Sequence, residues 1–213
     1  MKIGGKDITK SKTALVTGAS SGIGEATAQR LAMAGYQVYG TSRRGAPAGQ
    51  RSFAMLPLDV TNDESVEAAV TEVLRLEGRV DLLVNNAGFA VAPAGAEESS
   101  IEQAWSIFNT NFFGIVRMTR AVVPHMRQQG GGRIINIGSV LGFLPAPYMA
   151  LYAATKHAIE GIRSRSTTSY GQGASGSRSS SLRTRRRSST PTSCSPTRRS
   201  MSTARFARYW ARG

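Results

Sequence analysis

The chain has 213 residues, of which 40% are hydrophobic, and this is enough for one sizeable domain with a buried core. A formal net charge of +14 would normally indicate a nucleic-acid or anionic-membrane partner, but 12 of the 27 basic residues are arginines after position 161. Residues 1–161 carry 15 basic and 13 acidic groups and are therefore close to neutral.

Cysteine content and the length of the apolar runs narrow the class of protein further. The chain has one cysteine, Cys194, which excludes an intramolecular disulfide and a multi-cysteine metal site. No apolar run approaches the roughly 18 residues of a spanning helix, and the start MKIGGKDITKSK has no apolar export segment. We therefore expect a cytoplasmic protein with no bound metal and no membrane partner.

From residue 12 onward, short apolar or β-branched runs alternate with longer segments of helical periodicity, which is typical of a parallel α/β sheet. Strands are expected at residues 13–18, 36–42, 53–60, 80–88 and 132–139. Helices are expected at residues 23–35 and 63–78, as one long helix over 101–126, and from about residue 149. Because runs such as DLLV and RIINI are apolar throughout, helices should cover both sheet faces in a doubly wound arrangement.

The stretch VTGASSGIG places Gly18, Gly22 and Gly24 between the first strand and the first helix. Glycines at such a turn let the backbone bend sharply and approach a pyrophosphate, which the free N–H groups of the helix N-terminus stabilise. The spacing differs from the usual G-x-G-x-x-G, and a turn of this kind can also be only a tight connection.

About twenty residues later, where NAD-binding proteins place an acid on the ribose hydroxyls, the chain reads YGTSRR. It offers Ser42, Arg43 and Arg44 instead of an acid. A guanidinium can bind a 2′-phosphate through paired charge-assisted hydrogen bonds, which favours NADP over NAD. Arg43 is the better candidate because Arg44 is closer to the loop GAPAG; the alternative is a pair of solvated surface arginines.

Six motifs then follow one another in the order TGASSGIG, LDV, NNAG, TNFFG, IGSV and YAATK. With these motifs at these spacings, residues 12–161 resemble the short-chain dehydrogenase/reductase family. The resemblance implies a Rossmann-type sheet, here lacking its last strands, and hydride transfer between NAD(P) and a carbonyl or alcohol. It also implies that Asn85 helps to hold the central sheet together.

The resemblance assigns roles to individual residues. The catalytic tetrad would be Asn111, Ser139, Tyr152 and Lys156. The cofactor-binding set would be Gly18, Ser20, Ser21, Gly22, Ile23, Gly24, Ser42, Arg43, Asp59, Val60, Asn86, Ala87, Gly88, Tyr152 and Lys156. Within this set, Asp59 is implied to hydrogen-bond the adenine amino group.

The chemistry of carbonyl reduction explains why these residue types are needed. The developing alkoxide needs a proton, and a phenol with a pKa of about 10 is a poor base at neutral pH for the reverse reaction. Lys156 lies four residues after Tyr152 on the same helix face, so its cation can stabilise the phenolate. Ser139 can donate a hydrogen bond to the carbonyl oxygen, and Asn111 would position a water that relays protons to the lysine.

Two segments that follow strand ends are largely apolar: FAVAPAG at residues 89–95 and VLGFLPAPYMAL at residues 140–151. Ligands of open α/β sheets bind at the carboxyl ends of strands. These segments therefore favour a hydrophobic alcohol or ketone as substrate, although ordinary loop packing would produce the same composition.

The pattern stops after Gly161. Residues 162–213 are rich in arginine and serine, and we expect them to form a disordered tail after a Rossmann domain over residues 1–161. One hypothesis is an Arg/Ser-rich binding arm. The other is a change of reading frame just after Gly161: permitted codons for residues 162–187, regrouped by one base, can read YSESLDHELR-GRIRVSLVEPAYTRT. That phrase contains the helix, strand and Pro loop that the family requires next.

The leading hypothesis is an oxidoreductase that transfers hydride between NADP(H) and a hydrophobic alcohol or ketone. Little or no activity is expected of the chain as written, because the last strands and the closing loop would be missing. The alternative is a non-catalytic nucleotide-binding protein whose Arg-rich tail binds nucleic acid, the less favoured partner, or an acidic protein. The resemblance implies a homodimer or homotetramer once the C-terminal half is restored.

Overall fold

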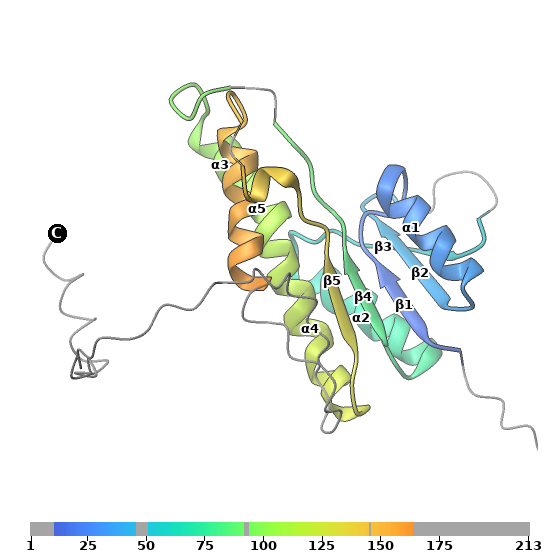
Figure 1. The fold of residues 1–213 in the computed structure, drawn as a ribbon. Coiled ribbons are helices and arrows are strands. Elements are labelled where there is room, and N and C mark those ends of the chain that lie inside the picture. Colours follow the sequence, from blue (N-terminus) through green and yellow to red (C-terminus); the bar gives the residue numbers. More distant parts are fainter. Residues whose placement is uncertain (1–10, 46–50, 92–93, 145, 164–213) are drawn as a thin grey trace, which may run out of the picture. The chain divides into compact units, whose positions relative to one another are not determined.

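The computed structural model describes residues 11–45, 51–91, 94–144 and 146–163. The tail hypotheses concern residues that lie almost wholly outside this described part, since only the start of the tail, up to Arg163, belongs to it. The strands are β1 (Thr13–Val16), β2 (Gln37–Ser42), β3 (Ala54–Pro57), β4 (Leu82–Asn85) and β5 (Arg133–Asn136). All four pairings are parallel and the order is β3-β2-β1-β4-β5 (Figure 1).

This strand order confirms the predicted doubly wound parallel sheet. The order reverses between β1 and β4, which is the position where open α/β sheets bind their ligands beyond the carboxyl ends of the strands. Asn85 stabilises this region from within, because its side-chain amide donates to Asn136 Oδ1 at 2.9 Å and so joins β4 to β5. In the described part of the chain, β5 is an edge strand.

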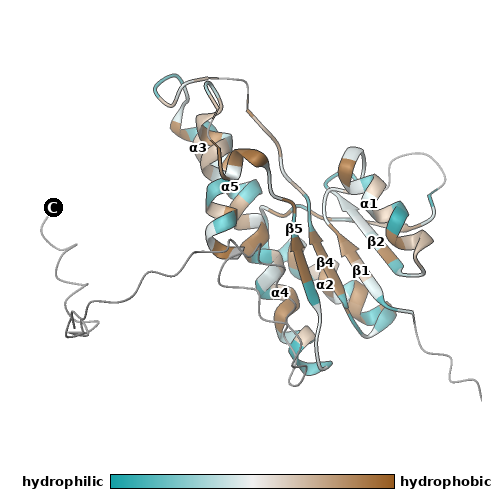
Figure 2. Cartoon of the chain, viewed as in Figure 1, coloured by the Kyte–Doolittle hydropathy of each residue, from teal (hydrophilic) through white to brown (hydrophobic). Residues whose placement is uncertain are grey.

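The central strands β1 and β4 are buried on both faces, as their continuous apolar sequences predict, whereas β5 is exposed at alternate residues, so the prediction drawn from RIINI was wrong for that strand. In β1, Leu15 packs into a cluster with helices α2 (Asp63–Glu77) and α4 (Gly114–Gln128), whereas Ala14 and Val16 pack into a second cluster with α1 (Gly22–Met33). Figure 2 shows brown, apolar ribbon in β4 and in the later part of β5, whose start is teal. Alternate residues of β1 therefore meet helices on opposite faces of the sheet.

The expected long helix over residues 101–126 is not one regular helix. It consists of α3 (Ile101–Phe108), a π-helical segment (Asn109–Phe113) and α4, and it runs on to Gln128. The chain is thus helical throughout the predicted range, but the prediction did not include the π conformation of these five residues, which shifts the side chains that follow it around the axis. The last helix, α5 (Ala150–Arg163), begins where the sequence predicts.

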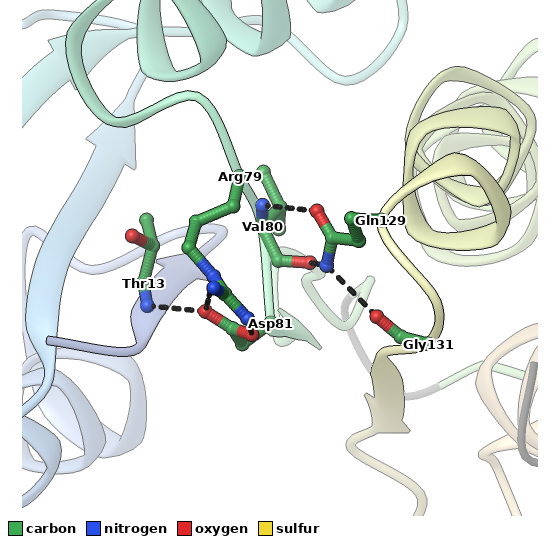
Figure 3. A network of polar contacts seen from close by, with 6 residues as sticks. All are labelled: Thr13, Arg79, Val80, Asp81, Gln129 and Gly131. Atoms are coloured by element: carbon green, nitrogen blue, oxygen red, sulfur yellow. Dashed lines mark hydrogen bonds and ion pairs between the residues drawn. The ribbon is translucent and has the colours of Figure 1, made fainter. Parts of the chain in front are cut away.

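A polar network closes the opposite, amino-terminal edge of the sheet (Figure 3). The Asp81 carboxylate accepts hydrogen bonds from the Thr13 N–H at 2.8 Å and from Arg79 Nε at 2.8 Å. The Gln129 side chain accepts from the Val80 N–H at 3.1 Å and donates to the Val80 carbonyl at 2.7 Å. Val80 is fully buried, so its backbone groups cannot bond to water, and the Gln129 side-chain amide supplies a hydrogen-bond partner to each of them.

We predict that Gln129→Ala lowers the free energy of unfolding by about 1–3 kcal/mol, because it leaves both backbone groups of buried Val80 without a partner. Urea unfolding measures the loss. The matched control is Gln128→Ala, at an exposed neighbouring position, which should change stability by less than about 0.5 kcal/mol. Equal losses in the two variants would contradict the role given to Gln129.

Candidate active site

The glycine turn between β1 and α1 lies directly against the loop that follows β4. Gly18 has φ +65°, and a Cβ on it would lie 2.9 Å from Ala87 Cα. A Cβ on Gly24 would collide with the Gly18 carbonyl and with the Asn86 side-chain amide. Only glycine therefore allows the first turn of α1 to approach the sheet this closely.

Thr17 and Asn86 fix the two loops to each other. Asn86 Nδ2 donates to the Thr17 and Gly18 carbonyls at 2.9 and 3.0 Å. Thr17 Oγ1 accepts the N–H groups of Asn86 and Ala87, each at 3.0 Å. The sequence analysis did not single out Thr17; the signal available was a hydroxyl residue placed between an apolar strand and the first glycine.

A cleft of about 240 Å³ opens at this edge of the sheet. Most of the predicted cofactor-binding residues line it: Gly18, Ser20, Ser21, Ser42, Arg43, Asp59, Val60, Asn86, Ala87 and Gly88. Four lining residues were not predicted, namely Thr41, Leu58, Phe89 and Thr110. Gly22, Ile23 and Gly24 instead form the start of α1 outside the lining, where the Ile23 side chain is 67% exposed.

Asp59 presents a charged carboxylate to this cleft. Its Oδ1 accepts hydrogen bonds from the Thr61 N–H at 2.9 Å and the Thr61 hydroxyl at 2.7 Å. Burial by itself would raise the pKa of Asp59, but the Thr61 hydrogen bonds and the charges of Arg43 and Arg117 lower that pKa below its usual value. The carboxylate is therefore an acceptor at neutral pH.

The two arginines after β2 differ in position. Both are exposed, but Arg43 lines the cleft whereas Arg44 does not. The Ser42 hydroxyl donates to the Gly45 carbonyl at 2.6 Å, so its proton is already used within the turn. Of the predicted trio, Arg43 is thus the group that faces the cleft with free donor capacity in its guanidinium.

Asn111 of the predicted tetrad lies buried in the π-helical segment. Its Oδ1 accepts the Phe89 N–H at 3.0 Å, and its Nδ2 donates to the Phe89 carbonyl at 2.9 Å and to Thr155 Oγ1 at 3.3 Å. The Thr155 hydroxyl in turn donates to the Tyr152 carbonyl at 2.8 Å. The loop after β4, the π segment and α5 are thereby joined through one asparagine and one threonine, and Thr155 was not predicted.

Tyr152 and Lys156 meet on α5. Lys156 Nζ lies 5.5 Å from the centre of the Tyr152 ring and donates to the Ile137 carbonyl, just after β5, at 2.9 Å. Burial lowers the pKa of Lys156 below its usual value, and the residue is only 8% exposed. Lys156 thus places a poorly solvated cation beside the phenol.

Ser139 begins the 3-10 turn Val140–Gly142, whose Gly142 packs against the backbone of Lys156. Ser139 Oγ accepts the Leu141 N–H at 3.2 Å, which leaves its own proton available for another acceptor. The structure therefore packs the turn that begins at Ser139 against the helix that carries Tyr152 and Lys156.

The two apolar segments also meet. Ala94 pairs with Met149 in a parallel bridge, and the Ala94 N–H donates to the Tyr148 carbonyl at 2.8 Å. Tyr148 has φ +60°, the one positive value at a non-glycine residue in the described part of the chain. Phe143 and Leu144 are exposed by 60% and 65%. The segments thus form an apolar rim beside the strand ends.

The described residues contain no group of three or more His, Cys, Asp or Glu side chains placed to hold a metal ion. Among the same residues, no helix is both long enough and apolar enough to cross a membrane.

Comparison with known proteins gives consistent matches. The family model described as short chain dehydrogenase matches residues 12–172. A 3-ketodihydrosphingosine reductase from Bacteroides thetaiotaomicron is 47% identical over 148 residues, which is 69% of this chain and 54% of that protein. The chain spans about half the length of the curated relatives it matches.

Solved structures share the fold. ElxO, solved with NADP bound, is 30% identical with a TM-score of 0.66, and the match covers 71% of this chain and 65% of ElxO. A 3-ketoacyl-(acyl-carrier-protein) reductase from Brucella melitensis, solved with NADH, is 35% identical with a TM-score of 0.68. That match covers 71% of this chain and 66% of the reductase.

We predict that Thr155→Val lowers the free energy of unfolding by about 1–3 kcal/mol, because the side chain keeps its shape but buried Asn111 loses an acceptor. Thr155→Ser keeps the hydroxyl and is the matched control, with a smaller loss. Chemical unfolding of the three proteins checks this. If valine were tolerated as well as serine, the hydroxyl would have no linking role.

Because the pKa of Lys156 is lowered, we predict that the difference in unfolding free energy between wild type and Lys156→Met changes with pH. Below that pKa the lysine is charged in both folded and unfolded states, and burying the cation destabilises the fold. As the pH rises toward the unfolded value of about 10.4, the folded state loses its proton first and this cost disappears. Wild type should therefore gain stability relative to Lys156→Met as the pH rises toward about 10.4. A difference in unfolding free energy that stays constant with pH would contradict the burial argument.

Proposed function

The chain belongs to the short-chain dehydrogenase family, and we propose that its Rossmann domain binds NADP(H) for the reduction or oxidation of a hydrophobic ketone or alcohol. The observation that carries this proposal is the cleft, in which the glycine turn, Asp59 and Arg43 converge at the switch point of the sheet. The family is an oxidoreductase family; the preference for NADP, the substrate and the activity of this chain are the proposed parts.

The residues present fit a dinucleotide. Ser21, the N-cap of α1, makes no side-chain cap hydrogen bond, whereas α2 and α3 are capped by Asn62 and Ser100. The first N–H groups of α1 therefore keep their capacity for a diphosphate. Gly18 and Gly24 leave the space that a Cβ would fill, and the Asp59 carboxylate can accept a hydrogen bond from an adenine amino group.

Arg43 supports NADP over NAD. It stands at the end of β2, lines the cleft and carries a charge that also acts on Asp59. No acid occupies the neighbouring positions Ser42 and Arg44, where a carboxylate would repel a 2′-phosphate. A planar guanidinium can bind such a phosphate through two parallel hydrogen bonds.

The catalytic step follows from groups on α5 and after β5. When bound, NADP(H) supplies or accepts the hydride. The Tyr152 hydroxyl gives its proton to the carbonyl oxygen of the ketone, or takes it back from the alcohol. The Lys156 cation stabilises the resulting phenolate. The Ser139 hydroxyl, which only accepts a hydrogen bond within its own turn, donates one to the same carbonyl oxygen.

The apolar rim supports a hydrophobic substrate. Val140, Phe143, Leu144 and Tyr148 are all at least 60% exposed, and they lie between Ser139 and Tyr152 in the chain. A long alkyl chain attached to the reacting carbonyl would cover them and release water. The similarity to a 3-ketodihydrosphingosine reductase supports a 3-keto compound with such a chain.

We propose that the chain as written binds the nucleotide but turns over a substrate poorly. The residues that line the cleft lie between Gly18 and Thr110, whereas Tyr152 and Lys156 stand on α5, directly before the Arg/Ser-rich sequence of residues 162–213. The chain also covers only about half of its curated relatives. We therefore expect NADPH binding by the chain as written, and efficient turnover of a hydrophobic ketone only when the coding frame after Gly161 is restored.

A homodimer or homotetramer remains part of the proposal. On α3, Ile101 and Trp105 lie one turn apart and are 70% and 65% exposed, which leaves an apolar strip on this helix.

The cofactor preference is tested by titrating the full chain with NADPH and with NADH. Arg43→Ala should weaken NADPH binding by about ten- to a hundredfold, since a charge-assisted contact contributes about 1.5–3 kcal/mol. It should leave NADH binding nearly unchanged. Arg44→Ala is the matched control, because Arg44 carries the same charge one residue away and does not line the cleft.

Equal losses for NADPH and NADH in Arg43→Ala would remove the argument for a 2′-phosphate contact. A chain that bound neither nucleotide while folded would contradict the proposed function itself.

A further inference from the structure

An ion pair lies beside the glycine turn that the proposed chemistry does not use. Arg51, just before β3, places Nη2 3.1 Å from Glu25 Oε1. The two side chains are 12% and 29% exposed, so solvent screens this pair less than a surface pair. The same Nη2 lies 3.5 Å from the Ser20 carbonyl, at the rim of the cleft. A cation from a distant segment thus contacts both the glycine turn and the helix that follows it.

The position of Glu25 makes this contact electrostatically significant. Glu25 lies in the first turn of α1, where the partial positive charge of the helix attracts anions. A carboxylate there is favourable for the helix but competes with any second anion bound at the same end. For a diphosphate at the glycine turn, an unneutralised Glu25 would act as a repulsive charge.

We propose that Arg51 neutralises Glu25 and thereby keeps the N-terminus of α1 attractive to the cofactor diphosphate. This inference rests on the proposed function, because it assumes a dinucleotide at the glycine turn. Arg51 acts through Glu25 and the Ser20 carbonyl and is a positioning residue. The effect is directed at the diphosphate, which NADPH and NADH share, and so differs from that of Arg43.

Two other roles for the pair predict different results. If the pair only clamps the segment before β3 to α1, removing either partner weakens the clamp, and removing both does not help. If Arg51 contacts a cofactor phosphate directly, loss of Glu25 does not compensate for loss of Arg51. Only neutralisation predicts that removing the carboxylate rescues the loss of the guanidinium.

The test is a double-mutant cycle on the full chain, with dissociation constants for NADPH and NADH measured at low ionic strength. Arg51→Gln should raise both constants by a similar factor, about three- to tenfold. Glu25→Gln should leave both within about twofold of wild type, and Arg51→Gln/Glu25→Gln should return to that range. In about 0.5 M KCl the effect of Arg51→Gln should shrink, because salt screens the unpaired carboxylate.

Arg75→Gln is the matched control, since Arg75 forms an exposed ion pair with Glu72 on α2; both constants should stay as in wild type. Arg51→Lys keeps the charge and should stay near wild type, which preserves the test if Arg51→Gln does not fold. An unchanged affinity in Arg51→Gln, or a double variant as weak as Arg51→Gln, would overturn the inference. Failure of folded wild type to bind either nucleotide would instead overturn the proposed function.

Discussion

The glycine turn and the loop after β4 touch through their backbones, with no side chain between Gly18 and Ala87. This contact sets how far the N-terminus of α1 stands from the carboxyl edge of the sheet. Thr17 and Asn86 hold it with four hydrogen bonds that use both backbone and side-chain groups. This spacing leaves room beside Asp59 and Arg43, and a displacement of either loop would move the lining residues that it carries, such as Gly18 and Ala87.

The two halves of the site are held by different means. The proposed nucleotide half is built from the end of β2 and the loops that follow β1, β3 and β4. The proposed catalytic half depends on α5, which Thr155 joins to the π segment and which Lys156 joins to the residue that follows β5. Lys156 and Asn111 are both buried polar residues, and burying a polar group costs stability that their hydrogen bonds partly offset.

Sequence alone predicted the parallel sheet and the cleft-lining residues well, because apolar runs and glycine turns are local signals. It failed where the determinant is a distant contact. In the π segment, Asn111 forms hydrogen bonds with Phe89, 22 residues earlier. The spacing of apolar residues along a helix does not predict such hydrogen bonds. Thr17 and Thr155 were not predicted for the same reason, because the hydrogen-bond partners of a single threonine cannot be inferred from the sequence around it. Asp59 was predicted at a strand end, yet β3 ends at Pro57 and the carboxylate is instead held by Thr61 in the following turn.

We propose that the close approach at Gly18 creates a cleft for the dinucleotide, and this can be tested by titrating the full chain carrying Gly18→Ala with NADPH. Gly35→Ala is the control, because Gly35 also has a positive φ but a Cβ there meets open space. Both variants carry the strain of a left-handed alanine, about 1 kcal/mol or more, which circular dichroism and thermal unfolding would register. Gly35→Ala should bind NADPH like wild type, whereas folded Gly18→Ala should have lost measurable affinity. Equal NADPH affinity in the two folded variants would contradict it.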